Sequence, residues 1–179
     1  MGTPRLRAYP RGVSPAPISI DDALTLAREG TEKAFCDRLG FGALVGTPPV
    51  SEEERSWSYH TVALRGTFSR AAPGIDLKTS WVYPLTKVQP RFAGTLLVGR
   101  AQSNDVCIDH ESISKLHARI RMDGDAMHIS DAGSKNGIEL DYTPLKGERE
   151  LKDGAMVRLG HYTFQFHRPA SLYRMLKAV

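Results

Sequence analysis

The stretch HARIRMDGDAMHIS, residues 117–130, decides the fold. Short runs of β-forming residues lie on both sides of Asp123-Gly124, and Asp-Gly is typical of the tight turn of a β-hairpin. The stretch therefore predicts two antiparallel strands, at 117–122 and 126–130.

Similar short runs separated by turn residues continue in both directions from this hairpin. They lie at 81–83, 95–98, 106–108, 138–140, 156–159 and 162–166. Many short strands with a turn roughly every 8–12 residues are typical of an antiparallel β-sandwich. We therefore expect a mainly β fold, with a sandwich over residues 80–168 and a short C-terminal helix over 169–179.

The region before Ser80 differs in composition and in hydrophobic pattern from the strand-rich part that follows it. Residues 1–18 contain four prolines and predict a flexible arm. Residues 19–79 predict a helical or mixed N-terminal extension, in which Ser19 caps a helix, Gly30 divides it in two, and a strand-like run follows at 59–64. The helical part has an apolar stripe, which we expect to pack on the domain that follows. Whether the extension is a second domain or part of the first stays open.

Composition excludes several classes of protein. The 179 residues are 41% hydrophobic and 25% charged, as in ordinary globular proteins, and no apolar run is long enough to insert into a membrane. A net charge of +4 is weak support for binding nucleic acid, and we expect none. The two cysteines, Cys36 and Cys107, form no CxxC pair, so we expect no disulfide framework and no metal site. A reducing, cytoplasmic location fits best, and a nuclear one stays open if the protein is eukaryotic.

Three segments between the predicted strands carry the informative polar residues. They are Gly99-Arg100, Ser114 to His117 and Asp131 to Gly137. Loops of a sandwich cluster at its ends, so these segments can converge there. Together they offer a guanidinium, a hydroxyl, two ammonium groups and a carboxamide. Such a set of donors suits a dianionic phosphate.

These segments resemble the motifs of the forkhead-associated (FHA) domain, a phosphothreonine-binding β-sandwich. Its pattern of Gly-Arg, Ser-x-x-His and Ser-x-Asn-Gly appears here in the same order and spacing, and the likeness covers about residues 80–166. Residues 1–79 resemble no family that we can name.

The resemblance implies a role for each matching residue. Arg100 and Ser114 would bind the phosphate, Lys115 would add a charge-assisted contact, and Asn136 would hold the main chain of the peptide. Lys135 stands where many members have threonine, and it would either contact the phosphate or point to solvent. The residues expected to support the site structurally are Gly99, His117, Ser134 and Gly137.

Two departures from the family pattern stand out. Ile138 follows the Asn-Gly pair where a threonine is common. Asp141-Tyr142 stands where an Asn-Gly hairpin is frequent. The second departure bears on peptide selectivity more than on phosphate binding.

Other interpretations remain for the same residues. Arg100 could be a surface ion-pair partner of Asp105 or Asp109. Ser114, His117 and Asp131 include the residue types of a hydrolase triad, but the sequence has no nucleophile elbow, no Walker loop and no kinase signature. We therefore expect a protein that is not an enzyme and needs no cofactor.

The sequence thus predicts a phosphothreonine-peptide-binding module in Ser/Thr kinase signalling. Its partner would be a phosphothreonine-containing protein, either a kinase or a kinase substrate. The alternative is a phosphate-independent structural or adaptor subunit, held in a larger assembly through residues 1–79.

Overall fold

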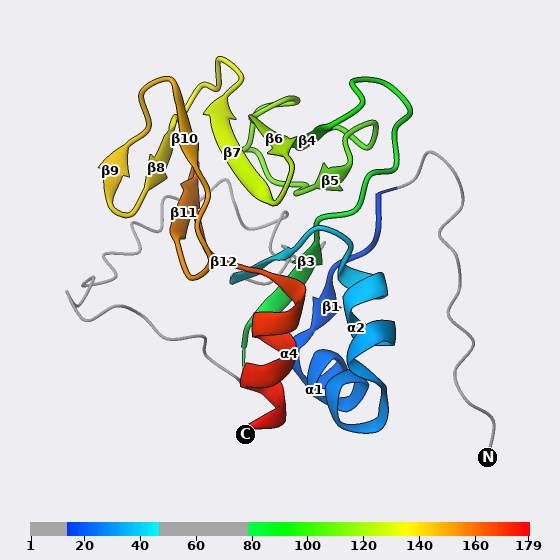
Figure 1. Cartoon of the computed structure of the whole chain (residues 1–179). Helices are drawn as coiled ribbons and strands as arrows, with labels where there is room; N and C mark the ends of the chain where they lie inside the picture. The colour runs from blue at the N-terminus through cyan, green and yellow to red at the C-terminus, as the bar shows by residue number, and fades with distance from the viewer. Residues whose placement is uncertain (1–13, 47–78) are drawn as a thin grey trace.

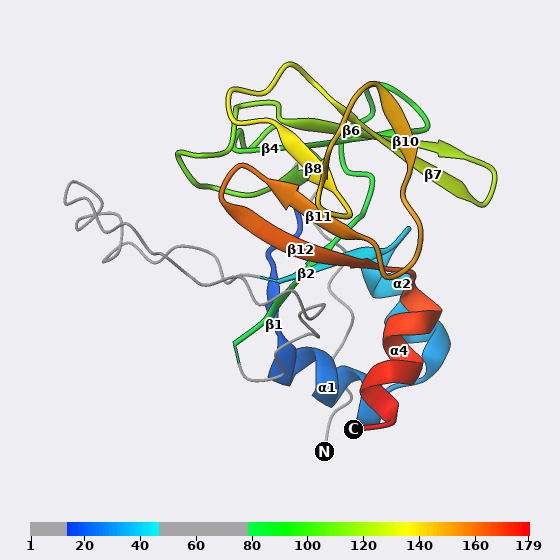
Figure 2. The ribbon, with the colours of Figure 1, turned by 90° about the vertical axis from the view of Figure 1, so that its left-hand side faces the viewer.

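The computed structural model describes residues 14–46 and 79–179. They form three layers, which are a five-stranded sheet, a seven-stranded sheet and a group of helices (Figures 1 and 2). The expected mainly β fold, a sandwich with helices from both ends of the chain, is confirmed. The interpretations that concern residues 1–13 and 47–78, including the strand-like run at 59–64, lie outside the described residues.

The seven-stranded sheet has the order β1-β3-β2-β12-β11-β8-β9, and all its neighbours are antiparallel. Its strands are β1 (Ile18–Ser19), β2 (Ala43–Gly46), β3 (Trp81–Pro84), β8 (Ile138–Leu140), β9 (Thr143–Pro144), β11 (Met156–Leu159) and β12 (Tyr162–His167).

The five-stranded sheet has the order β10-β7-β6-β4-β5. Its strands are β4 (Thr95–Gly99), β5 (Val106–Cys107), β6 (Ala118–Asp123), β7 (Ala126–Asp131) and β10 (Glu148–Glu150). The predicted hairpin is confirmed as β6 and β7, which pair from Ala118 opposite Asp131 to Asp123 opposite Ala126. The pairing of β4 with β5 is parallel.

Strand β2 was not predicted, although it lies between β3 and β12 in the seven-stranded sheet. Its side chains alternate between two cores. Leu44 joins the core between the sheets, whereas Ala43 and Val45 join a second core under the helices. A run of four residues that follows two glycines is too short to show the period of a strand. Pairing with the adjacent strands, rather than an intrinsic β preference, therefore makes these residues a strand.

The helices are α1 (Ile20–Glu29), α2 (Glu32–Leu39) and α4 (Pro169–Lys177). The Ser19 hydroxyl accepts a hydrogen bond from the backbone N–H of Asp22 at 3.1 Å, which confirms the predicted cap. Gly30 separates α1 from α2 as expected. No helix within the two described ranges is long and apolar enough to cross a membrane.

The apolar stripe of the N-terminal helices is buried, as expected, against the chain itself. Ala23, Ala27 and Phe35 form a core with Leu172 and Leu176 of α4 and with one face of β2 and β3. The ring of Phe35 also lies 5.5 Å from that of Tyr173. Segments from both ends of the chain therefore make up one helical layer on the outer face of the seven-stranded sheet (Figure 1).

The carboxylate of Asp105 organises the start of β4 and β5. Its side chain is fully buried and accepts hydrogen bonds at 2.8–2.9 Å from the Lys87 ammonium and from the backbone N–H groups of Val88, Gln89 and Leu97. Burial alone would raise the pKa of Asp105, but Lys87 and these N–H groups outweigh it and hold that pKa below its ordinary value.

We expect Asp105→Asn to lower the free energy of unfolding by about 3–5 kcal/mol, because the partly buried Lys87 ammonium loses its counter-charge. Urea unfolding measures the loss. The control is Asp37→Asn, which breaks an exposed Lys33–Asp37 pair of the same 2.8 Å length and should cost about 0.5 kcal/mol or less. Equal losses in the two variants would contradict the assignment.

The stabilisation by Asp105 should also depend on pH. Since its pKa is lower in the folded chain than the value of about 3.9 in the unfolded chain, the stabilisation is present above that value. It is lost as the pH falls through the folded-state pKa. The stability difference between wild type and Asp105→Asn should therefore shrink below about pH 4, and a constant difference from pH 7 to pH 3 would refute this.

Candidate functional site

The three polar segments singled out in the sequence meet at one end of the sandwich. The backbone N–H of Arg100 donates to the Ser114 carbonyl at 2.9 Å, and that of Lys135 donates to the Ser114 hydroxyl oxygen at 3.0 Å. The Asn136 carboxamide donates to the Ser112 carbonyl at 2.8 Å. The β4–β5, β5–β6 and β7–β8 loops are thus joined directly to one another.

Gly99 allows the first two loops to approach closely. A Cβ atom at this position would lie 2.5 Å from the Lys115 carbonyl oxygen and 2.9 Å from that of Ser114. Real Cβ atoms do not come so near to backbone, so any side chain here would push the segment bearing Ser114 away. The glycine therefore sets the distance between Arg100 and Ser114.

Asn104 is a supporting residue that the sequence did not reveal. Its side chain is buried and donates to the carbonyl groups of Ala101 and Lys115, at 2.9 and 2.6 Å. It therefore ties its own loop to the one that carries Ser114. A single asparagine in a polar loop gives no pattern by which it could have been found.

His117 joins the second loop to the third. The ring is fully buried, and Nδ1 accepts a hydrogen bond from the backbone N–H of Ser114 at 3.0 Å. Nε2 lies 3.1 Å from the Gly137 carbonyl oxygen. Because Nδ1 is an acceptor, Nε2 carries the proton and donates to Gly137. One neutral imidazole thus fixes both loops.

The β7–β8 loop is shaped by a carboxylate of its own. Asp131 accepts hydrogen bonds from the backbone N–H groups of Gly133 and Ser134 and from the Ser134 hydroxyl, at 2.6–2.9 Å. Burial alone would raise the pKa of Asp131, but the hydrogen bonds from Ser134 and Gly133 lower it overall. Gly137 closes the loop with a φ of 71°, a conformation that glycine adopts without strain.

Three cationic groups stand at this end of the sandwich. Within the described ranges the Arg100 guanidinium makes one hydrogen bond, from Nε to the Ile113 carbonyl at 3.2 Å. Lys115 and Lys135 are exposed. Within residues 14–46 and 79–179, no acidic side chain pairs with these three cations. Asp105, considered above as a partner of Arg100, is instead held by Lys87.

The arrangement does not form a hydrolase triad. The Ser114 hydroxyl oxygen accepts from the Lys135 backbone, and His117 contacts the backbone N–H of Ser114 rather than its hydroxyl. Asp131 is occupied by its own loop. No group of three or more metal-ligating side chains occurs in the part of the chain that the structure describes. What the site offers is hydrogen-bond donors and positive charge.

The Asp141-Tyr142 departure lies at the other end of β8. Both residues adopt positive φ angles, 50° and 62°, and so supply the conformation for which Asn-Gly is usually chosen. Asp141 stabilises the turn by accepting from the Met156 N–H at 2.9 Å. The hairpin is therefore separated from Asn136 by the full length of β8.

Comparison with known proteins identifies the sandwich. Residues 96–160 match the model of the FHA domain family, so the chain contains an FHA domain there, as the motifs predicted. The chain is 34% identical over 68 residues to the FHA domain-containing protein FhaA of Mycobacterium tuberculosis. It is 28% identical over 98 residues to the transcriptional regulatory protein EmbR of the same species.

These matches cover part of each protein. They span 38% and 55% of this chain, but only 13% of FhaA and 24% of EmbR. A solved structure of Mycobacterium tuberculosis EmbR in complex with a low-affinity phosphopeptide is similar over 49% of this chain and 21% of that chain, with 29% identity and a TM-score of 0.43.

The bridging role of His117 leads to a prediction. His117→Leu should lower the free energy of unfolding by about 1–3 kcal/mol, because Ser114 N–H and Gly137 carbonyl are left unpaired. It should also speed hydrogen exchange of the Ser114 amide, measured by NMR. His161→Leu, at an exposed histidine, is the control. An unchanged Ser114 exchange rate in His117→Leu would contradict the role.

Proposed function

We propose that the end of the sandwich around Arg100 binds phosphothreonine in a partner protein and so converts phosphorylation into docking. The observation that carries the proposal is the meeting of Arg100, Ser114, Lys115, Lys135 and Asn136 at the joined loops of an FHA domain. The chain acts as a binding module in Ser/Thr kinase signalling, not as an enzyme. It works in the cytoplasm, where kinase and partner meet it.

The chemistry of each group suits a phosphate ester. At pH 7 the phosphate carries about −1.5 to −2 charges and three strong acceptor oxygens. The two Nη atoms of Arg100 can engage two of these oxygens together. The Ser114 hydroxyl already accepts from Lys135, so its proton is left to donate to a third.

The remaining groups play supporting parts. Lys115 and Lys135 add positive charge from exposed positions, so their contribution is screened by salt. One N–H of the Asn136 carboxamide is spent on Ser112. Its other N–H and its oxygen have no partner among residues 14–46 and 79–179, so they can bind the main chain of the peptide. The methyl group of threonine distinguishes it from serine, and the family resemblance implies a preference for phosphothreonine.

The alternative, a phosphate-independent adaptor held through residues 1–79, gains little from the described part of that region. In residues 14–46 the apolar helix faces are covered by α4 and by the seven-stranded sheet. Partner binding measured before and after phosphatase treatment separates the two functions. Binding that survives dephosphorylation would favour the adaptor.

Arg100→Ala should weaken binding of a phosphothreonine peptide by about 100-fold or more, because a paired, charge-assisted contact is lost. Calorimetry measures the affinity, and circular dichroism checks the fold. Arg119→Ala removes an equally charged, exposed side chain from the neighbouring β6 and should bind normally. Unchanged affinity in Arg100→Ala would reject the proposed site.

Lys115 and Lys135 should strengthen peptide binding through their position at the site and not merely through the net charge of the protein. Lys115→Ala combined with Lys135→Ala should lower affinity by about tenfold and make it less sensitive to salt. The matched control combines Lys146→Ala with Lys152→Ala, which removes the same net charge from exposed positions outside the site. Equal effects in the two double variants would mean that net charge, not the site, attracts the peptide.

A further inference from the structure

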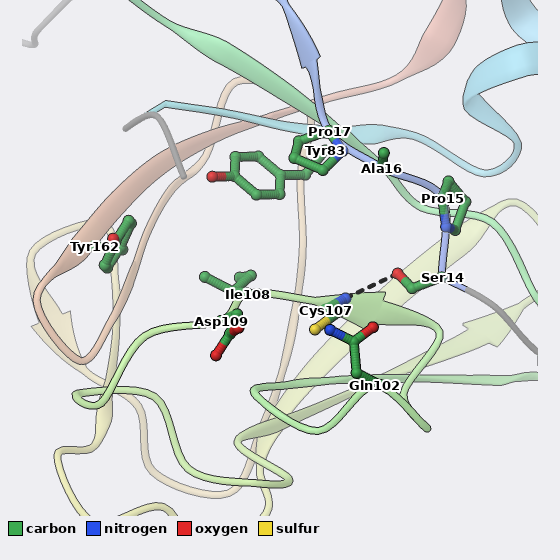
Figure 3. Close-up of a pocket in the computed structure, with 10 residues that line it drawn as sticks. All are labelled: Ser14, Pro15, Ala16, Pro17, Tyr83, Gln102, Cys107, Ile108, Asp109 and Tyr162. Carbon is green, nitrogen blue, oxygen red and sulfur yellow. Dashed lines mark hydrogen bonds between the residues drawn. The ribbon is translucent and has the colours of Figure 1, made fainter. Parts of the chain in front are cut away.

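A cavity of about 330 Å³ lies between residues 14–17 and the part of the sandwich that carries Tyr83, Ile108 and Tyr162 (Figure 3). Its walls are mostly carbon. The apolar and aromatic residues that line it are Pro15, Ala16, Pro17, Tyr83, Ile108 and Tyr162. Figure 3 shows the tyrosines on one side of the cavity, with Ser14 and Pro15 on the other.

The wall formed by residues 14–17 is fastened to the sandwich. The Ser14 hydroxyl donates to the Asp105 carbonyl at 3.0 Å and accepts from the Cys107 backbone N–H at 2.9 Å. A side chain thus occupies the edge of β5, where another strand would otherwise pair. The cavity is therefore built between two attached walls.

The cavity lies next to the backbone that carries Arg100. Cys107, which lines it, pairs in register with Gly99, and its sulfur lies 3.4 Å from the carbonyl oxygen of Arg100. Gln102, at the rim, belongs to the same loop as Arg100. A peptide held at Arg100 needs to extend by only a few residues to reach the cavity.

Six of the ten residues that line the cavity lie outside the segment that matches the FHA family. Residues 14–17 and Tyr83 precede the matched range of 96–160, and Tyr162 follows it. The wall formed by residues 14–17 also lies outside the sandwich of residues 80–168, so it is an addition to that sandwich. The volume of the cavity is near the lower end of the roughly 300–1,000 Å³ of small-molecule sites, and it suits one large side chain.

We infer that this cavity takes a tryptophan or another bulky aromatic side chain from the phosphothreonine-bearing partner. The inference rests on the proposed function, because the phosphate contact brings the partner to this end of the sandwich. Aromatic rings pack well on tyrosine and aliphatic surfaces, and buried aromatic residues are the usual anchors of protein interfaces. The cavity thus selects among phosphorylated partners by a residue a short distance from the phosphothreonine.

The test uses phosphothreonine peptides of one sequence in which a single tryptophan is moved through an otherwise alanine background on both sides of the phosphothreonine. The full chain should bind one position at least about tenfold more tightly than the all-alanine peptide. No preference at any position, with Arg100-dependent binding intact, would overturn this inference and leave the proposed function standing. Failure of every phosphothreonine peptide to bind would overturn both.

A variant that fills the cavity makes the test specific. Gln102→Trp places an indole at the exposed rim and should remove the tryptophan preference while keeping affinity for the alanine peptide. Ser103→Trp, in the same loop but not lining the cavity, should keep the preference. A preference retained in Gln102→Trp would contradict the inference.

A second measurement does not depend on that variant. In a Cys36→Ser background the half-buried Cys107 is the remaining thiol. The preferred tryptophan peptide should slow its alkylation more than the all-alanine peptide does when both are at saturating concentration. Equal rates with the two peptides would place the tryptophan elsewhere and refute the inference.

Discussion

The buried carboxylate of Asp105 is the constraint on which the binding end of the molecule depends. Four donors from the segment before β4 and from β4 itself converge on it, and its own carbonyl receives the Ser14 hydroxyl. A carboxylate without those donors could not remain buried. Ser14, the loop before β4 and the two parallel strands are therefore held as one unit, and Arg100 extends from that unit.

The loops at the binding end are held together by hydrogen bonds from side chains to backbone groups, and their three cationic side chains stay largely outside this network. His117, Asn104 and Asp131 spend their hydrogen bonds on backbone groups of the three loops. Within the described residues, the side chains of Arg100 and Lys115 contribute one hydrogen bond to it, from Arg100 Nε to the Ile113 carbonyl. The loops are thus ordered before any ligand arrives, so little ordering entropy remains to be lost on binding.

Much of this arrangement could be predicted from the sequence, and the rest could not for identifiable reasons. The hairpin at 117–130 and the three loop motifs depend on local spacing, which a sequence displays directly. The alternative in which Arg100 pairs with Asp105 could not be decided from the sequence, because the actual partner, Lys87, is set by tertiary packing that no spacing rule reports. Strand β2 was missed for the same reason, since pairing with β3 and β12 is what makes it a strand.

The position of β2 has a consequence for how the chain folds. Gly46 pairs with Phe164, and the helices that follow β1 are covered by α4, so the seven-stranded sheet joins segments from opposite ends of the sequence. Such distant contacts raise the contact order, and chains of high contact order fold slowly. On the ribosome, β2 and the apolar faces of α1 and α2 must wait until β12 and α4 have emerged. A nascent chain therefore exposes these apolar surfaces until α4 has been synthesised, and exposed apolar surface favours aggregation and binding by chaperones.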